Sequence, residues 1–142
     1  EALLVSASLQ DMLARHLREH GNLAHFGKRN AIHLNDTHPA LAPAELMRLL
    51  LDEQGLSWEE AWKIVSEAVS YTNHTLLPEA LESWPVEMMG RLLPRHLQII
   101  FLINWNHLQE VRKSGLTDQD FLSSVSLVVS AELTGRLIAT GR

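Results

Sequence analysis

The sequence contains no cysteine, and this absence excludes two classes of protein at once. Without cysteine there is no disulfide scaffold and no thiolate nucleophile, a composition that also suits a cytoplasmic protein. Lysine and arginine number 12 against 17 aspartate and glutamate residues, so the net charge is −5 and nothing favours the basic surface that nucleic acid selects. No apolar run is long enough to cross a bilayer, and no membrane partner is expected.

Glycine-rich phosphate loops are absent too, and no serine sits in a nucleophile elbow. What is present is ordinary globular composition: 142 residues, of which 46% are hydrophobic and 20% charged. This length suggests one domain with a real core. The chain begins with glutamate inside an amphipathic pattern, and we therefore expect a piece of a longer protein.

Hydrophobic periodicity predicts helices around a few short strands, which is an α/β fold. The expected helices are marked by apolar residues three or four apart and by capping or proline signals: residues 5–20, 39–55, a helix from the Ser57–Glu60 capping box, one from Ser83, one from Pro94 to Lys113 and a short one from Thr117. The expected strands are short apolar runs at residues 31–34 and 125–129, and residues 69–72 are either the end of the preceding helix or a further short strand. Residues 21–30, which are polar and punctuated by glycine, are expected to form a loop.

Two polar clusters follow the first two expected strands. One is Asn35–Pro39, and the other is Tyr71–Glu82. Their carboxylate, imidazole, amide and hydroxyl groups are those that hydrogen-bond a polyol such as a sugar, and sites often lie on such loops. Residue types alone nevertheless favour a simpler interpretation, in which asparagine, aspartate and threonine next to proline make turns and helix caps.

Other constellations favour structural roles. His16 and His20 have metal-ligand spacing on a helix but lack a third ligand, so we expect an exposed helical surface and no metal site. Trp58 and Trp62 could stack on a sugar ring, but their place on an apolar stripe predicts core packing.

A pair of carboxylates for glycoside hydrolysis is a further hypothesis. Asp36 could pair with Glu79 or Glu82, but sequence gives no separation between them. The two glutamates are equally interpretable as acidic residues in the first turn of a helix.

The two clusters resemble motifs of the α-glucan phosphorylases, the family of glycogen, starch and maltodextrin phosphorylases. Further resembling segments occur in the same order along the chain, and the resemblance runs over residues 5–111 and fades after about Ser126. The resembling segments are residues 5–11, 35–39, 45–48, 71–82, 84–85 and 92–100.

The resemblance implies a helix-rich part of the Rossmann-like N-terminal domain of a two-domain, glycosyltransferase-B enzyme. It implies phosphorolysis of terminal α-1,4-linked glucose to glucose 1-phosphate, with α-1,4-glucan and inorganic phosphate as substrates. It also implies a cytoplasmic homodimer and a pyridoxal phosphate cofactor. The cofactor's lysine would lie outside this chain, so the chain alone is expected to be inactive. A glucan-binding module without chemistry and a helical interaction domain are the alternatives.

The same resemblance assigns site residues. It places His74 and Asp36 in the catalytic cleft, and it places four further residues against the substrate, namely His38, Thr75, Asn73 and Glu82. A secondary glucan site on the helix from Pro94 would use Gln98, Phe101 and Asn104. Leu102 replaces an acidic residue of the family there, and for Phe101 core packing is the favoured interpretation.

Overall fold

The computed structural model describes residues 1–74, 77, 82–129 and 132–134 of the chain. The chain divides into two compact units, the first formed by Glu1–His74 and the second by the chain from Thr75 onward. The helix-rich α/β prediction is confirmed, because the first unit combines several helices with a small parallel sheet. None of the helices in the described ranges is both long and apolar enough to cross a membrane.

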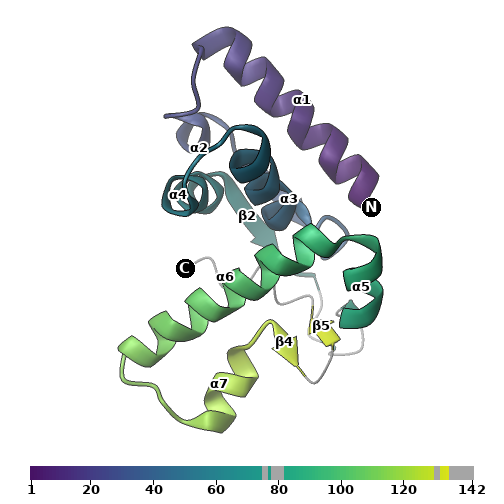
Figure 1. The fold of residues 1–142 in the computed structure, drawn as a ribbon, viewed down its shortest axis with the longest axis vertical. Coiled ribbons are helices and arrows are strands. Elements are labelled where there is room, and N and C mark those ends of the chain that lie inside the picture. The colour runs from purple at the N-terminus through teal and green to yellow at the C-terminus, as the bar shows by residue number, and fades with distance from the viewer. Residues whose placement is uncertain (75–76, 78–81, 130–131, 135–142) are drawn as a thin grey trace. The chain divides into compact units, whose positions relative to one another are not determined.

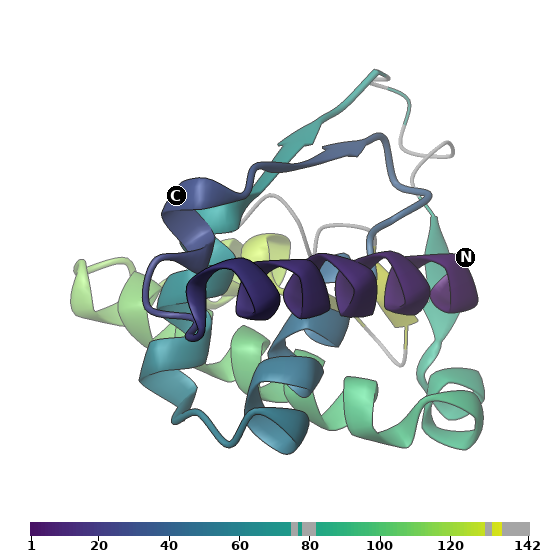
Figure 2. The ribbon, with the colours of Figure 1, turned by 90° about the horizontal axis from the view of Figure 1, so that it is seen from above.

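The first unit is built around two parallel strands (Figure 1). Its elements, in chain order, are α1 (Ala2–His20), α2 (Phe26–Arg29), β1 (Ile32–Asn35), α3 (Ala42–Arg48), the π-helical turn η1 (Leu49–Glu53), α4 (Trp58–Ala68) and β2 (Val69–Thr72). Parallel strands need a long crossover, which α3, η1 and α4 supply here. Figure 2 shows the two strands running side by side above α1.

Local signals explain most of these boundaries. Pro43 lies in the first turn of α3, where a missing N–H costs nothing. The capping box predicted at Ser57 is confirmed, because the Ser57 side chain accepts from the Glu60 backbone and the Glu60 side chain accepts from the Ser57 backbone. The side chains of Trp58 and Trp62 are only half-buried, so the predicted core of α4 is carried instead by its small and aliphatic residues: Ala61, Ile64, Val65 and Ala68.

Two predictions for the first unit need correction. The expected loop at residues 21–30 contains the single helical turn α2, whose Phe26 is fully buried. The helix expected up to residue 55 keeps α-helical geometry only to Arg48 and continues as the π-helical turn η1.

Within its described residues, the second unit combines three helices with a small antiparallel sheet. Its elements are β3 (Ser83–Pro85), α5 (Val86–Leu92), α6 (Pro94–Lys113), α7 (Gln119–Val125), β4 (Val128–Val129) and β5 (Glu132–Thr134). The strand order is β3-β5-β4, and both pairings are antiparallel. The predicted start of a helix at Pro94 is confirmed.

Several boundaries in the second unit differ from prediction. Residues Ser83–Pro85 form a strand because they pair with β5, and the helix begins only at Val86. The short helix is capped by Asp118 rather than Thr117, since the Asp118 side chain accepts from the Phe121 backbone N–H. The strand expected at residues 125–129 contains only Val128–Val129, because Val125 ends α7.

Candidate functional site

The two polar clusters meet at one edge of the parallel sheet. Asn35 ends β1 and lies in register with Thr72, which ends β2. The Asp36 backbone N–H donates to the Thr72 carbonyl at 2.9 Å, and this bond extends the pairing beyond the strands. Because parallel strands bring their carboxyl ends to the same edge, chain segments 39 residues apart converge where sites of α/β folds usually lie.

Asp36 turns the chain out of β1. Its φ is 65°, which makes it the only non-glycine residue with positive φ within the described ranges. Aspartate tolerates this conformation because its short side chain can bond locally, and here Oδ1 accepts from the Thr37 N–H at 2.8 Å. The other oxygen, Oδ2, makes no hydrogen bond to the described residues. Asp36 therefore forms the turn and still presents half of a carboxylate at the sheet edge.

The turn continues directly into α3. Thr37 is buried, and its carbonyl accepts from the Ala40 N–H at 3.0 Å. His38 is exposed between these fixed positions. A compact turn thus holds an imidazole at the rim of the sheet edge.

His74 contributes the second imidazole. Its Nε2 lies 2.5 Å from Asn35 Oδ1, across the sheet edge. An amide oxygen can only accept, so Nε2 carries the proton and Nδ1 of the neutral ring is left as an acceptor. Asn73 is exposed beside His74. Sequence reasoning gave Asn35 no role of its own, because its partner is known only once the strand register is known.

Tyr71 completes the group of polar side chains at this edge. Burial raises the pKa of the Tyr71 phenol, and the negative charge of Asp36 raises that pKa further. Tyr71 therefore remains neutral and keeps its O–H as a donor.

Not every predicted site residue can be placed at this edge. Thr75 and Glu79 lie outside the described residues. Glu82 belongs to the second unit, where its Oε2 is shielded from solvent and has no hydrogen-bond partner among the described residues. The predicted pairing of Asp36 with Glu79 or Glu82 therefore stays a prediction.

The residues of the predicted secondary glucan site on α6 fall into two groups. Gln98 is exposed, and Phe101 is 41% exposed, so the expectation that Phe101 packs in the core is wrong. Asn104 is half-buried instead, and its Oδ1 accepts from the Leu127 N–H at 2.8 Å. Asn104 therefore holds the chain that follows α7, while Gln98 and Phe101 face outward from this unit.

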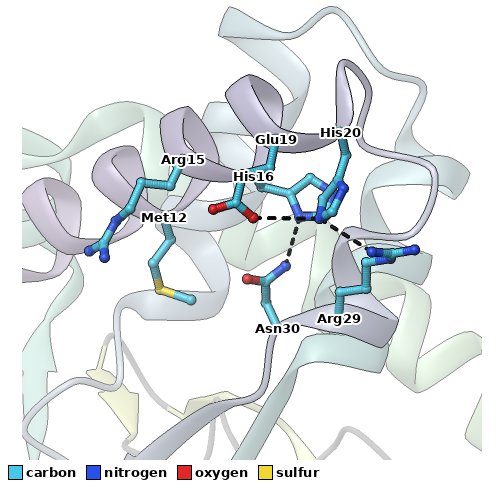
Figure 3. A pocket seen from close by; sticks show the side chains of 7 residues that line it. All are labelled: Met12, Arg15, His16, Glu19, His20, Arg29 and Asn30. Atoms are coloured by element: carbon cyan, nitrogen blue, oxygen red, sulfur yellow. Dashed lines mark hydrogen bonds and ion pairs between the residues drawn. The ribbon is translucent and has the colours of Figure 1, made fainter.

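A separate pocket of about 340 Å³ lies at the end of α1 (Figure 3). His16 lines it but is only 4% exposed, so the expected exposed surface is wrong at this residue. Asn30 Nδ2 lies 3.1 Å from His16 Nδ1, and the Phe26 ring meets the imidazole edge-on at 5.1 Å between ring centroids. The described residues contain no group of three or more side chains suited to hold a metal ion.

A charged network ties α1 to α3, the helix that follows the Asp36 turn in sequence. Glu45, 2% exposed, accepts from the Ser6 hydroxyl at 2.6 Å and from Arg48 Nε at 2.8 Å. Arg48 also donates to Glu53 at 3.0 Å. Hydrogen bonds to Glu45 raise the pKa of Arg48, so the guanidinium stays charged. This network fixes the helix that follows the turn and thereby the position of the turn itself.

Comparison with known proteins adds to this geometry. Residues 1–137 match the family model of the carbohydrate phosphorylases. The chain is 57% identical over 128 residues to a glycogen phosphorylase of Haemophilus influenzae, covering 90% of this chain and 16% of that protein. It is 50% identical over 123 residues to a glycogen phosphorylase of Saccharomyces cerevisiae, with coverages of 87% and 14%. It is 47% identical over 130 residues to cytosolic alpha-glucan phosphorylase 2 of Arabidopsis thaliana, with coverages of 88% and 16%. The chain thus spans 14–16% of the length of these relatives.

Proposed function

We propose a function for the full-length protein that contains this chain, starting from the premise that the chain belongs to the carbohydrate phosphorylase family. That protein cleaves the terminal α-1,4-linked glucose of a glucan with inorganic phosphate and releases glucose 1-phosphate. This chain supplies one wall of the sugar site. The observation that supports this role most strongly is the convergence of the two polar clusters at the edge of the β1–β2 sheet, where His74 and Asn35 bond.

Asp36 stabilises the positive charge that develops on the sugar during the reaction. Glycosyl transfer passes through a transition state with oxocarbenium character. A carboxylate that is already fixed, as Asp36 is by its bond to the Thr37 N–H, stabilises that positive charge more than it stabilises the neutral ground state. The turn holds this carboxylate in place before substrate arrives, so little reorganisation is needed.

The remaining groups at the edge hold the sugar. His74 Nδ1 accepts from a sugar hydroxyl because Nε2 is occupied by Asn35. His38 and Asn73 are exposed at the same edge and provide further hydrogen-bonding groups. Thr75 and Glu82 are included in the substrate-binding set, and Gln98, Phe101 and Asn104 in a secondary glucan site, on the family resemblance alone.

The full-length protein is further proposed to be a cytoplasmic homodimer with a two-domain, glycosyltransferase-B architecture and a pyridoxal phosphate cofactor. The lysines of this chain do not fit that cofactor, because Lys28, Lys63 and Lys113 are all exposed and a Schiff-base lysine needs a shielded pocket. The cofactor therefore belongs to another part of the full-length protein.

Replacement of the two central residues tests the proposal. In the full-length protein we expect His74→Ala and Asp36→Ala each to lower turnover at least about tenfold, equivalent to about 1.4 kcal/mol of transition-state stabilisation. Release of glucose 1-phosphate is the measurement, and circular dichroism checks that each variant is folded. Asp36→Asn removes the charge but tolerates the positive φ, so it separates electrostatics from turn geometry.

A matched control uses His25, which is exposed at the start of α2. His25→Ala removes an imidazole from the same unit without touching the sheet edge, and turnover should stay unchanged. Near-normal turnover in both His74→Ala and Asp36→Ala would contradict the site assignment.

A further inference from the structure

We propose that Asn35 is the positioning residue for His74: it fixes the orientation of the imidazole and selects which ring nitrogen faces the sugar. This inference rests on the proposed function and assigns a task to a residue that neither the sequence motifs nor the comparisons single out. Asn35 itself need not touch the substrate, since it acts through the ring that it holds.

The geometry gives the two partners unequal freedom. Asn35 is the last residue of β1 and is fixed by pairing with Thr72. His74 lies two residues beyond the end of β2, where strand pairing no longer holds the chain. The bond between His74 Nε2 and Asn35 Oδ1, at 2.5 Å, therefore anchors the less constrained residue to the more constrained one.

The bond also decides the tautomer. Imidazole alone would exchange its proton between Nδ1 and Nε2, and rotation about its side-chain bonds would present either nitrogen to a ligand. Because Oδ1 of Asn35 accepts and does not donate, the Nε2–H form is favoured and Nδ1 keeps its lone pair for a sugar hydroxyl. His74 thus requires a hydrogen-bond acceptor at the position of Asn35. A side chain of similar size without an acceptor would not replace it.

A purely structural role is the competing explanation, in which the bond only closes the end of the sheet. The two explanations differ when His74 is absent. If Asn35 acts through His74, its replacement should cost nothing further once the imidazole has been removed. If it only supports the sheet, the cost should be the same with or without His74.

The experiment is a double-mutant cycle in the full-length protein, with phosphorolysis as the readout. Asn35→Leu keeps the approximate shape but has no acceptor, and we expect kcat to fall about fivefold or more with KM changed less than about twofold, because a misplaced group mainly affects the transition state. Asn35→Asp keeps an accepting oxygen, and at a pH high enough to keep the imidazole neutral beside the new carboxylate it should retain more of the turnover than Asn35→Leu. Adding Asn35→Leu to His74→Ala should lower kcat no further.

Asn22→Leu is the matched control. It makes the same change of side chain in the same unit and also removes a hydrogen-bond acceptor, because Asn22 Oδ1 accepts from the Ala24 N–H at 3.0 Å. Asn22 is exposed between α1 and α2 and belongs to neither polar cluster. Turnover of this variant should match that of the unaltered protein.

Two results would overturn the inference: unchanged turnover in Asn35→Leu, or an equal loss from Asn35→Leu in the unaltered and His74→Ala backgrounds. If the unaltered protein releases no glucose 1-phosphate, the proposed function fails separately. Positioning is still tested then by ¹⁵N chemical shifts of histidine-labelled protein, with His74→Ala assigning the signal. His74 should show the Nε2–H tautomer and should lose that preference in Asn35→Leu, and an unchanged tautomer in Asn35→Leu would refute the inference.

Discussion

Asp36 shows how one residue can serve the backbone and the site together. Its positive φ turns the chain from β1 toward α3, and the bond from the Thr37 N–H fixes its carboxylate at the sheet edge. Strained backbone is often found at functional sites because the surrounding structure must hold it in place. Here the sheet holds one side, through the bond from Asp36 to the Thr72 carbonyl, and buried Thr37 holds the other.

Gly27 is a second position where a single residue decides the packing. A Cβ placed there would lie 2.7 Å from Glu67 Cβ and 2.9 Å from the Ile64 carbonyl oxygen, so α2 and α4 touch only because the side chain is absent. Gly27→Ala should push the two helices apart and destabilise the fold by about 1–3 kcal/mol, the usual cost of overpacking. A lowered thermal unfolding midpoint of the full-length protein, with faster amide hydrogen exchange in α2 and α4, is the expected result.

Gly90→Ala is the control for that substitution. Gly90 lies within α5, and a Cβ there would meet only Leu97 Cδ2 at 3.4 Å. Alanine favours the helix over glycine, so this variant should be neutral or slightly stabilising. Equal amide exchange rates in α2 and α4 before and after Gly27→Ala would show that the close contact between these helices does not contribute to their stability.

At the scale of elements, the packing of α1 on α2 depends on a neutral histidine. Burial lowers the pKa of His16 and electrostatic interactions with His20 and Arg29 lower it further, while Glu19 and a hydrogen bond with the Asn22 backbone act in the opposite direction. Protonation of His16 in place would put an uncompensated charge beside Phe26. In an opened form, in which α1 has separated from α2 and water reaches His16, there is no such penalty. His16 then takes up a proton near its ordinary pKa of 6.5.

A pH dependence with a definite sign follows. Because the opened form binds more protons than the packed form as the pH falls below about 6.5, the stability of the α1–α2 packing is fully present above that pH and is lost progressively between it and the lowered pKa of packed His16. Amide hydrogen exchange of the full-length protein, corrected for the intrinsic effect of pH, should show weaker protection of residues 16–30 at pH of about 5.5 than at about 7.5. The cause of this weaker protection is proton uptake by His16, and not the shape of the pocket.

His16→Phe isolates that cause, because phenylalanine fills similar space and cannot titrate. Its protection at residues 16–30 should be nearly the same at both pH values. A pH effect that persists in His16→Phe would assign the titration to another group, of which His20 is the nearest, at 4.5 Å between ring centroids.

Elements with strong local signals were predicted correctly from sequence. The capping box at Ser57 and the start of α6 at Pro94 both depend on residues within a few positions of each other. For residues 69–72 the end of a helix and a short strand were both open, and the strand forms because it pairs with β1. Helix α2 was missed because Phe26 becomes buried only when that turn packs on α4, and β3 was missed because it exists through its pairing with β5. His16 was misplaced for the same reason, since the residues that bury it come from α2 and Asn30 rather than from its own helix.

The candidate site, like the fold, could be predicted only in part from sequence. Sequence identified both polar clusters and the chemistry they share. It did not reveal the bond from His74 to Asn35, because that contact follows from the register of two strands separated by a long crossover. Register is set by the packing of the whole β1–α3–α4–β2 arrangement, which no local motif encodes.

At the scale of the whole molecule, the chain presents surface that a complete enzyme would cover. Phe101, Leu102 and Trp105 on α6 are between 41% and 59% exposed, and both His74 and His38 are open to solvent. Apolar side chains gathered on one helix usually mark a surface that packs against something else. Since the chain spans only 14–16% of the length of the three relatives described above, we propose that other parts of the full-length protein supply the remaining walls of the candidate site at the β1–β2 edge.

One wall is expected to bind sugar weakly and to perform no chemistry. A well-formed pocket buries most of its ligand, whereas an exposed edge leaves much of the sugar hydrated, and water competes for every hydrogen bond. We therefore expect the 142-residue chain, titrated with a maltooligosaccharide and followed by calorimetry or NMR, to show a Kd of about 1 mM or weaker, which is about −4 kcal/mol. It should release no glucose 1-phosphate with added phosphate. Circular dichroism establishes beforehand that the chain is folded, and His74→Ala should abolish any weak binding. Micromolar affinity retained in His74→Ala would instead identify a glucan-binding module whose contacts lie away from the sheet edge.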